Sequence, residues 1–104
     1  MLGTVPGMLQ GAYTAGDSFS VTFAGGAYPA GEGWVGTLKL IPRDGAGAPI
    51  QITCDASGDD HVADATASAT ASWVAGHYGW VFWVTLSGAV ATVAQGTTEI
   101  RPDP

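Results

Sequence analysis

The clearest strand in the sequence is Tyr78-Gly-Trp-Val-Phe-Trp-Val-Thr-Leu86, a run dominated by aromatic and β-branched residues. Residues of these types favour extended backbone that pairs into a sheet. Ser87-Gly88 follows as a two-residue hairpin turn, which predicts that Ala89 to Gln95 returns beside the run. Together they indicate a protein that contains antiparallel β-strands.

Both faces of this strand are apolar. Successive side chains of a strand point to opposite sides, so one face holds Tyr78, Trp80 and Phe82, and the other holds Val81 and Trp83. In a two-layer sandwich only one face of a sheet meets the core. We expect Trp80 and Phe82 inside, in line with Tyr78. The face with Trp83 is then covered by the N-terminal residues or available to a partner.

The rest of the chain predicts further short strands. Its 16 glycines and 6 prolines are spread along the whole length, where they separate short runs of β-branched and aromatic residues. Strands are expected over 9–14, 18–23, 34–41, 50–54, 61–65 and 97–101. About seven or eight short strands separated by turns are typical of a Greek-key β-sandwich, so we predict an all-β fold.

The length predicts one domain. A chain of 104 residues has room for a single hydrophobic core, because domains typically hold about 100 to 150 residues. Residues 9–104 are therefore expected to form one domain. Residues 1–8 have no clear period and contain Pro6 and Gly7, so we expect an N-terminal arm that becomes ordered only against a neighbour.

Two features refine the expected sandwich. Thr66 to Trp73 is rich in alanine but too short and too rich in Ser and Thr for a stable isolated helix, so we expect one helical turn that bridges the sheets, with Trp73 packed beneath it. Tyr78 follows where the chain enters the central strand. This position is similar to the tyrosine corner of immunoglobulin-like sandwiches, whose hydroxyl bonds to upstream backbone. We therefore predict an immunoglobulin-like Greek-key sandwich.

The charge argues against nucleic acid and membranes as partners. Three basic and nine acidic residues give a net charge of −6, which repels phosphate backbones and anionic headgroups. No apolar run approaches the roughly 18 to 20 residues of a spanning helix, and the N-terminus lacks the basic start of a signal peptide. We expect synthesis and folding in a cytoplasm.

Four residues are candidate contacts for a partner. Val81 and Trp83 lie on the second face of the central strand, Tyr28 lies in the glycine-rich loop 24–33, and Trp34 follows that loop. Aromatic residues are enriched at protein interfaces. Exposed Trp and Tyr also stack on sugar rings, but no planar row of aromatics flanked by hydrogen-bonding side chains is evident. A core and subunit-interface role is favoured, and a carbohydrate- or protein-binding module is the alternative.

No catalytic, metal or cofactor site is predicted. The acidic residues of 55–64 lack the spacing of a calcium loop, so a solvated turn is expected there. His61 and His77 have no third zinc ligand in register. The sequence contains no nucleophile elbow, no phosphate-binding loop, and no Ser or Cys with a plausible His and acid pair. We expect a protein without enzymatic activity.

The single cysteine, Cys54, cannot form an internal disulfide, so the sandwich has to rely on packing. It lies in register with Ile50 and Ile52, on the face expected to point inward. We therefore expect a small buried apolar residue and not a nucleophile.

Three segments resemble small proteins encoded among the virion genes of tailed bacteriophages and prophages: Ala15-Gly-Asp-Ser-Phe-Ser-Val-Thr-Phe23, Tyr28-Pro-Ala-Gly-Glu-Gly-Trp34 and Ala75-Gly-His-Tyr-Gly-Trp80. The likeness extends over residues 11–102. It implies a structural virion component of immunoglobulin-like fold, in a head, neck, tail or baseplate, and carries over no catalytic residue. The implied partners are other virion proteins and further copies related by symmetry. The implied location is the virion, assembled in the host cytoplasm.

Overall fold

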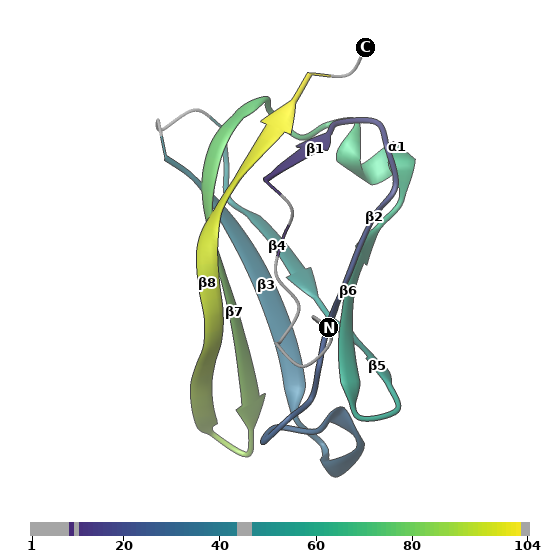
Figure 1. The fold of residues 1–104 in the computed structure, drawn as a ribbon, viewed down its shortest axis with the longest axis vertical. Coiled ribbons are helices and arrows are strands. Elements are labelled where there is room, and N and C mark those ends of the chain that lie inside the picture. The colour runs from purple at the N-terminus through teal and green to yellow at the C-terminus, as the bar shows by residue number, and fades with distance from the viewer. Residues whose placement is uncertain (1–8, 10, 44–46, 103–104) are drawn as a thin grey trace.

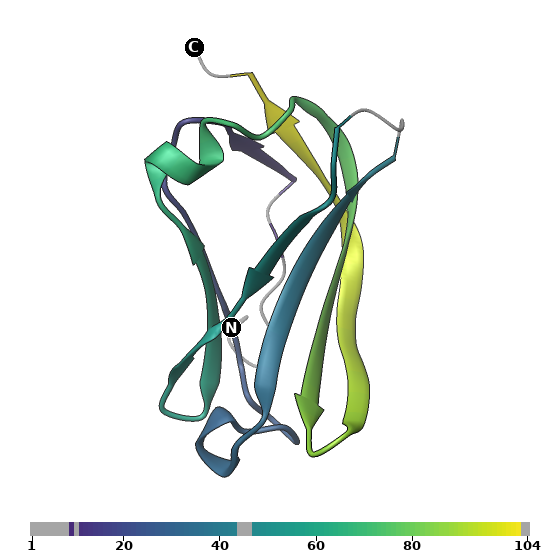
Figure 2. The ribbon, with the colours of Figure 1, turned by 180° about the vertical axis from the view of Figure 1, so that it is seen from behind.

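The computed structural model describes residues 9, 11–43 and 47–102, which form two β-sheets. The sheets face each other along the long axis of the molecule (Figure 1), and the view from behind shows the same two layers (Figure 2). The prediction of an all-β fold is confirmed. The predicted N-terminal arm, residues 1–8, lies outside the described residues.

The larger sheet has five strands in the order β1-β8-β7-β3-β4, and the smaller has three in the order β2-β6-β5. The strands of the larger sheet are β1 (Ala12–Thr14), β8 (Ala89–Arg101), β7 (Gly76–Leu86), β3 (Val35–Pro42) and β4 (Ile50–Thr53). Those of the smaller sheet are β2 (Phe19–Phe23), β6 (Asp60–Ala65) and β5 (Asp55–Ser57). The helical elements of the described chain are η2 (Ala30–Glu32), a 3-10 turn, and α1 (Ala67–Thr70).

Strand β7 lies in the middle of the larger sheet, between β3 and β8. The expected inner face is confirmed, because Trp80 is 3% exposed and Phe82 is fully buried. Phe82 stacks on Phe23 of β2, with the ring centroids 4.0 Å apart and the planes 5° from parallel. Apolar burial is the dominant stabilising term in folding, so this pair fastens the two sheets to each other.

The core continues toward the end of the sandwich where α1 lies. Phe19 of β2 packs edge-on against Trp73, with centroids 5.4 Å apart, and also contacts the ring of Tyr13 of β1. Trp73 is half-buried. The expected helical turn between the sheets is present as α1, and Trp73 contacts the core as predicted.

Two buried side chains tie this end of the sandwich to its neighbours. Thr70 of α1 accepts a hydrogen bond from the backbone N–H of Gly16 (3.0 Å) and donates to the carbonyl oxygen of Asp17 (2.7 Å), which fixes the helix to the turn between β1 and β2. Tyr78, at the start of β7, donates from its hydroxyl to the carbonyl oxygen of Val74. This is the upstream backbone bond expected for Tyr78.

The β7–β8 hairpin confirms one prediction and corrects another. Ser87 and Gly88 both have positive φ, at 49° and 89°, and so form the predicted two-residue turn. The returning chain was expected to break near Gly96, but β8 runs unbroken from Ala89 to Arg101. Gly96 stays paired with Trp80, and a β-carbon there would lie 3.0 Å from the indole Nε1. The glycine therefore makes room for the indole instead of ending the strand.

Other strand boundaries also differ from the sequence prediction. Within the described part of the first expected strand, β1 extends over Ala12–Thr14, and β3 begins at Val35, one residue after Trp34. Asp55–Ser57, expected in a loop, pairs with β6 as strand β5. All three residues of β5 are exposed, so the segment has no alternating apolar signal. Gly58, at φ 61°, allows the tight turn into β6.

We predict that Gly36→Ala destabilises the fold. A β-carbon at this position of β3 would lie 2.7 Å from Cε1 of Phe82 and 3.1 Å from Cγ of His61, both buried. Overpacking of this kind costs about 1–3 kcal/mol, measured as a lower midpoint of urea unfolding. Gly11→Ala is the matched control, because no atom lies within 4 Å of the position that its β-carbon would take. Equal midpoints for the two variants would contradict the packing around Gly36.

Candidate interaction surface

The outer face of the larger sheet presents several partly exposed apolar side chains. Val81 and Trp83 of β7 alternate with fully buried Phe82 and Val84, so their side chains lie on this outer face, where both are partly exposed. Ile41, near the end of β3, is 44% exposed. These residues form a row across β7 and β3, which we call the outer apolar row: Ile41, Val81 and Trp83.

Polar side chains flank the outer apolar row. The register places Trp83 between Thr37 of β3 and Thr92 of β8, and Val81 between Lys39 of β3 and Gln95 of β8. Side chains directly opposite each other on adjacent strands are close enough to interact, so the two threonines can contact Trp83, and the lysine and glutamine can contact Val81. Trp83 and Val81 therefore each lie between polar side chains of the two adjacent strands.

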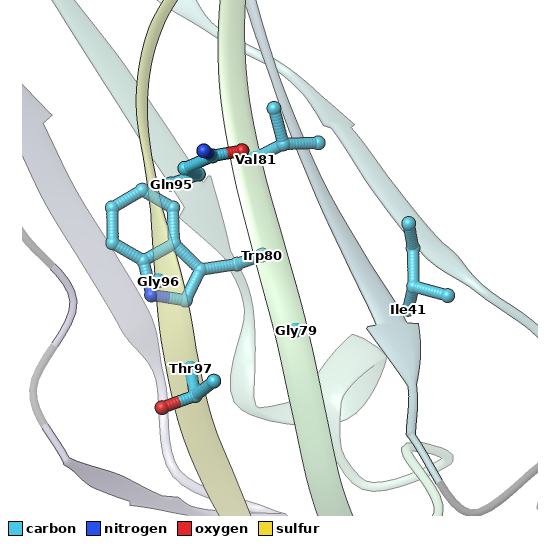
Figure 3. A pocket seen from close by; sticks show the side chains of 7 residues that line it. All are labelled: Ile41, Gly79, Trp80, Val81, Gln95, Gly96 and Thr97. Carbon is cyan, nitrogen blue, oxygen red and sulfur yellow. The ribbon is translucent and has the colours of Figure 1, made fainter.

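An open hollow of about 510 Å³ lies beside the outer apolar row, over Gly79 of β7. Its side-chain walls come from Ile41 on one side of β7 and from Gln95 and Thr97 on the other, with Val81 at one end (Figure 3). Gly79 has no side chain, so its neighbours on both adjacent strands stand above it. The hollow is open toward solvent, and its lining is mainly apolar.

Tyr28 and Trp34 lie elsewhere and face the core. Their rings pack edge-on with centroids 5.0 Å apart, and both are partly buried against the core. The carbonyl oxygen of Tyr28 lies 2.8 Å from Nε2 of His61, which is only 2% exposed. The four candidate residues therefore form two separate pairs. Val81 and Trp83 lie on the outer face of the larger sheet, whereas Tyr28 and Trp34 pack against the core.

Sequence reasoning missed the hollow itself. Ile41, Gly79, Gln95 and Thr97 come from three strands, and only the register of those strands brings them together. A signal was present at Gly79, because a glycine within a strand often marks a close approach of another group. The sequence alone did not say which strands flank it.

The acidic residues and histidines that the structure describes do not assemble into a metal site. Among the described residues, no three of the His, Cys, Asp and Glu side chains are grouped to hold a metal ion. His61 is buried beside Phe82, with ring centroids 5.7 Å apart, while His77 is exposed on β7. The two histidines thus have different surroundings, one in the core and one on the surface.

Cys54 is buried, as expected, at 8% exposure. Burial, followed by the nearby carboxylates of Asp55 and Asp64, raises the pKa of its thiol from 9.0 to about 12. Both causes disfavour the thiolate, which is the reactive form. The environment of Cys54 is the opposite of one that activates a cysteine nucleophile.

No protein-family model matches this chain, and a search of curated proteins finds no match either. Within the described part of the chain, no helix has the length and apolar character needed to cross a membrane.

We predict that Cys54 of the folded protein reacts slowly with thiol reagents. With the pKa raised from 9.0 to about 12, the thiolate fraction at pH 8 is about a thousandfold lower than in the unfolded chain. Alkylation followed by mass spectrometry in buffer and in denaturant measures the ratio. Similar rates in the two states would contradict this environment.

The same shift sets a direction for the pH dependence of stability. The folded pKa is raised, so the contribution of this thiol to the free energy of unfolding is present below pH 9.0 and is lost as the pH rises toward about 12. Cys54→Ala removes the titrating group. We expect the loss of stability between these pH values to be smaller in this variant than in the unmodified chain, as measured by urea unfolding.

Proposed function

We propose that the chain is a non-enzymatic structural or assembly protein of a tailed bacteriophage particle, and that it acts through the outer face of its larger sheet. The observation that carries the proposal is the outer apolar row. Phe82 and Trp80 already supply the inner face of β7 with a core, yet Val81 and Trp83 add apolar side chains to the other face. Apolar surface rimmed by polar groups favours contact with another protein.

An immunoglobulin-like Greek-key topology is part of the proposal. In variable-type immunoglobulin domains, strands G, F and C lie side by side in one sheet, and additional strands extend that sheet beyond strand C. The order β8-β7-β3-β4 in one sheet and β2-β6-β5 in the other fits that arrangement. The bond from the Tyr78 hydroxyl to the Val74 carbonyl adds support, because it has the character of a tyrosine corner.

The chemistry of the surface supports contact and not catalysis. None of the described residues that line the hollow over Gly79 has an ionisable side chain, and the polar ones are Gln95, Thr97 and the indole of Trp80. Catalysis at neutral pH commonly relies on a positioned acid or base. The partners that we propose are other virion proteins and further copies of the chain. They would bind during assembly in the host cytoplasm and stay bound in the virion.

Carbohydrate binding by the same face is the alternative function. Trp83 is partly exposed between Thr37 and Thr92, whose hydroxyls could bond to a sugar stacked on the indole. However, Trp83 is the single Trp, Tyr or Phe on the outer face of the described strands of the larger sheet. Glycan-array binding that is lost in Trp83→Ala, with the fold intact, would favour this alternative.

The proposal predicts that the chain is present in purified particles. Particles from the phage or lysogen that carries the gene would be isolated by density gradient and analysed by mass spectrometry. The gene is also expected among capsid and tail genes. Absence of the chain from the particles would overturn the proposal.

A substitution at Trp83 tests whether the contact with other virion proteins uses the outer face of the larger sheet. We expect Trp83→Ser to lower incorporation into particles by about tenfold or more, because an aromatic residue at the centre of an interface contributes much of the binding energy. Val74→Ser is the matched control, since Val74 is 46% exposed and precedes β7, outside the strands of the larger sheet. Thermal unfolding of both purified variants checks that they remain folded. Equal incorporation would place the contact elsewhere.

A further inference from the structure

The charges of the molecule are divided between its two sheets. All three basic residues lie on the larger sheet or next to it. Lys39 lies on β3 and Arg101 ends β8, while Arg43 follows β3, with its backbone N–H bonded to the carbonyl of His77 on β7 (2.9 Å). The smaller sheet has no basic residue. Its acidic residues are Asp55, Asp59, Asp60 and Asp64, on β5, on β6 and in the turn between them.

The outer face of the smaller sheet is an acidic surface with an apolar centre. Asp64 alternates with fully buried Ala63, so it lies on the outer face and is exposed. Val62 lies on the same face, where the register sets Asp55 and Thr22 on either side of it. The partly exposed Val62 side chain is therefore surrounded by carboxylate and hydroxyl groups.

The outer face of the larger sheet has the complementary character. Lys39 lies beside Val81 in the register, next to the hollow over Gly79. The described carboxylate on this face is that of Glu99, whose Oε1 lies 3.9 Å from Nε of Arg101. The outer face of the larger sheet therefore has a cation, Lys39, beside an apolar hollow. The outer face of the smaller sheet has carboxylates around an apolar side chain, Val62.

We propose that the outer face of the larger sheet binds the acidic outer face of the smaller sheet of a second copy of this chain. In this contact Lys39 faces Asp64, and Val62 of one copy enters the hollow over Gly79 of the other. Opposite charges at an interface favour one partner and one orientation. This inference rests on the proposed function, because it takes the outer face of the larger sheet as a contact surface and names its occupant.

The arrangement of the faces determines how copies combine. The two outer faces lie on opposite sides of the sandwich (Figures 1 and 2), so a copy that uses one face still has the other free. A contact between two different faces is heterologous, and it produces rings or open rows. Copies are therefore expected to join head to tail.

Charge reversal at both faces gives a direct test. Sedimentation velocity of the purified chain measures association at about 150 mM NaCl, where the repulsion between copies of net charge −6 is largely screened. In the proposed pair, Lys39→Glu sets two carboxylates opposite each other, and Asp64→Lys sets two ammonium groups opposite each other. Each variant alone is expected to associate about tenfold or more weakly than the unmodified chain.

An equimolar mixture of the two variants restores complementary faces, and we expect it to associate about as strongly as the unmodified chain. Asp17→Lys, in the turn that joins β1 to β2 at the end of the sandwich, is the control that reverses an exposed charge away from both faces. An unmodified chain that stays monomeric at millimolar concentration, or a mixture that does not recover association, overturns the inference. Detection of the chain in particles is a separate measurement, so the proposed function can survive that result.

Discussion

Stacking between Phe23 and Phe82 is the contact on which the two-sheet arrangement depends. The two rings come from the central strand of the larger sheet and from an edge strand of the smaller one, and both are fully buried. The chain has a single cysteine and hence no internal disulfide to hold the sheets together. Packing at this contact leaves no room for a β-carbon at Gly36. The position of β3 in the sheet therefore follows from the same pair of rings.

The sequence was informative wherever a strand has one buried face. In β2 the burial alternates strictly, because Phe19, Val21 and Phe23 point inward and the residues between them point outward. In β7 the alignment with Tyr78 was enough to choose the inner face. The exposed strand β5 has no apolar face to bury, so no such pattern could reveal it. The predicted break of the last strand at Gly96 was wrong. The glycine is needed there because its lack of a side chain leaves room for the indole of Trp80.

The candidate surface was predictable only in part. Val81 and Trp83 could be assigned to the second face of β7 from alternation alone, whereas Tyr28 and Trp34 required knowledge of how the loop folds back on the core. The distribution of charge was also invisible in the sequence, where Lys39 and Asp64 are merely two residues in a chain of net negative charge. Strand order assigns them to different sheets and hence to different sides of the molecule.

The pairing of β1 with β8 has a mechanical consequence. These two strands are the first and last of the described chain, and they run parallel, with Ala12 opposite Glu99 and Thr14 opposite Arg101. A pull that separates the two ends of the domain therefore draws these strands past each other along their length. Their cross-strand hydrogen bonds, such as those from Glu99 to Gly11 and from Ala15 to Arg101, are stretched together and not one after another. Tension applied along β1 and β8 therefore loads their hydrogen bonds in shear.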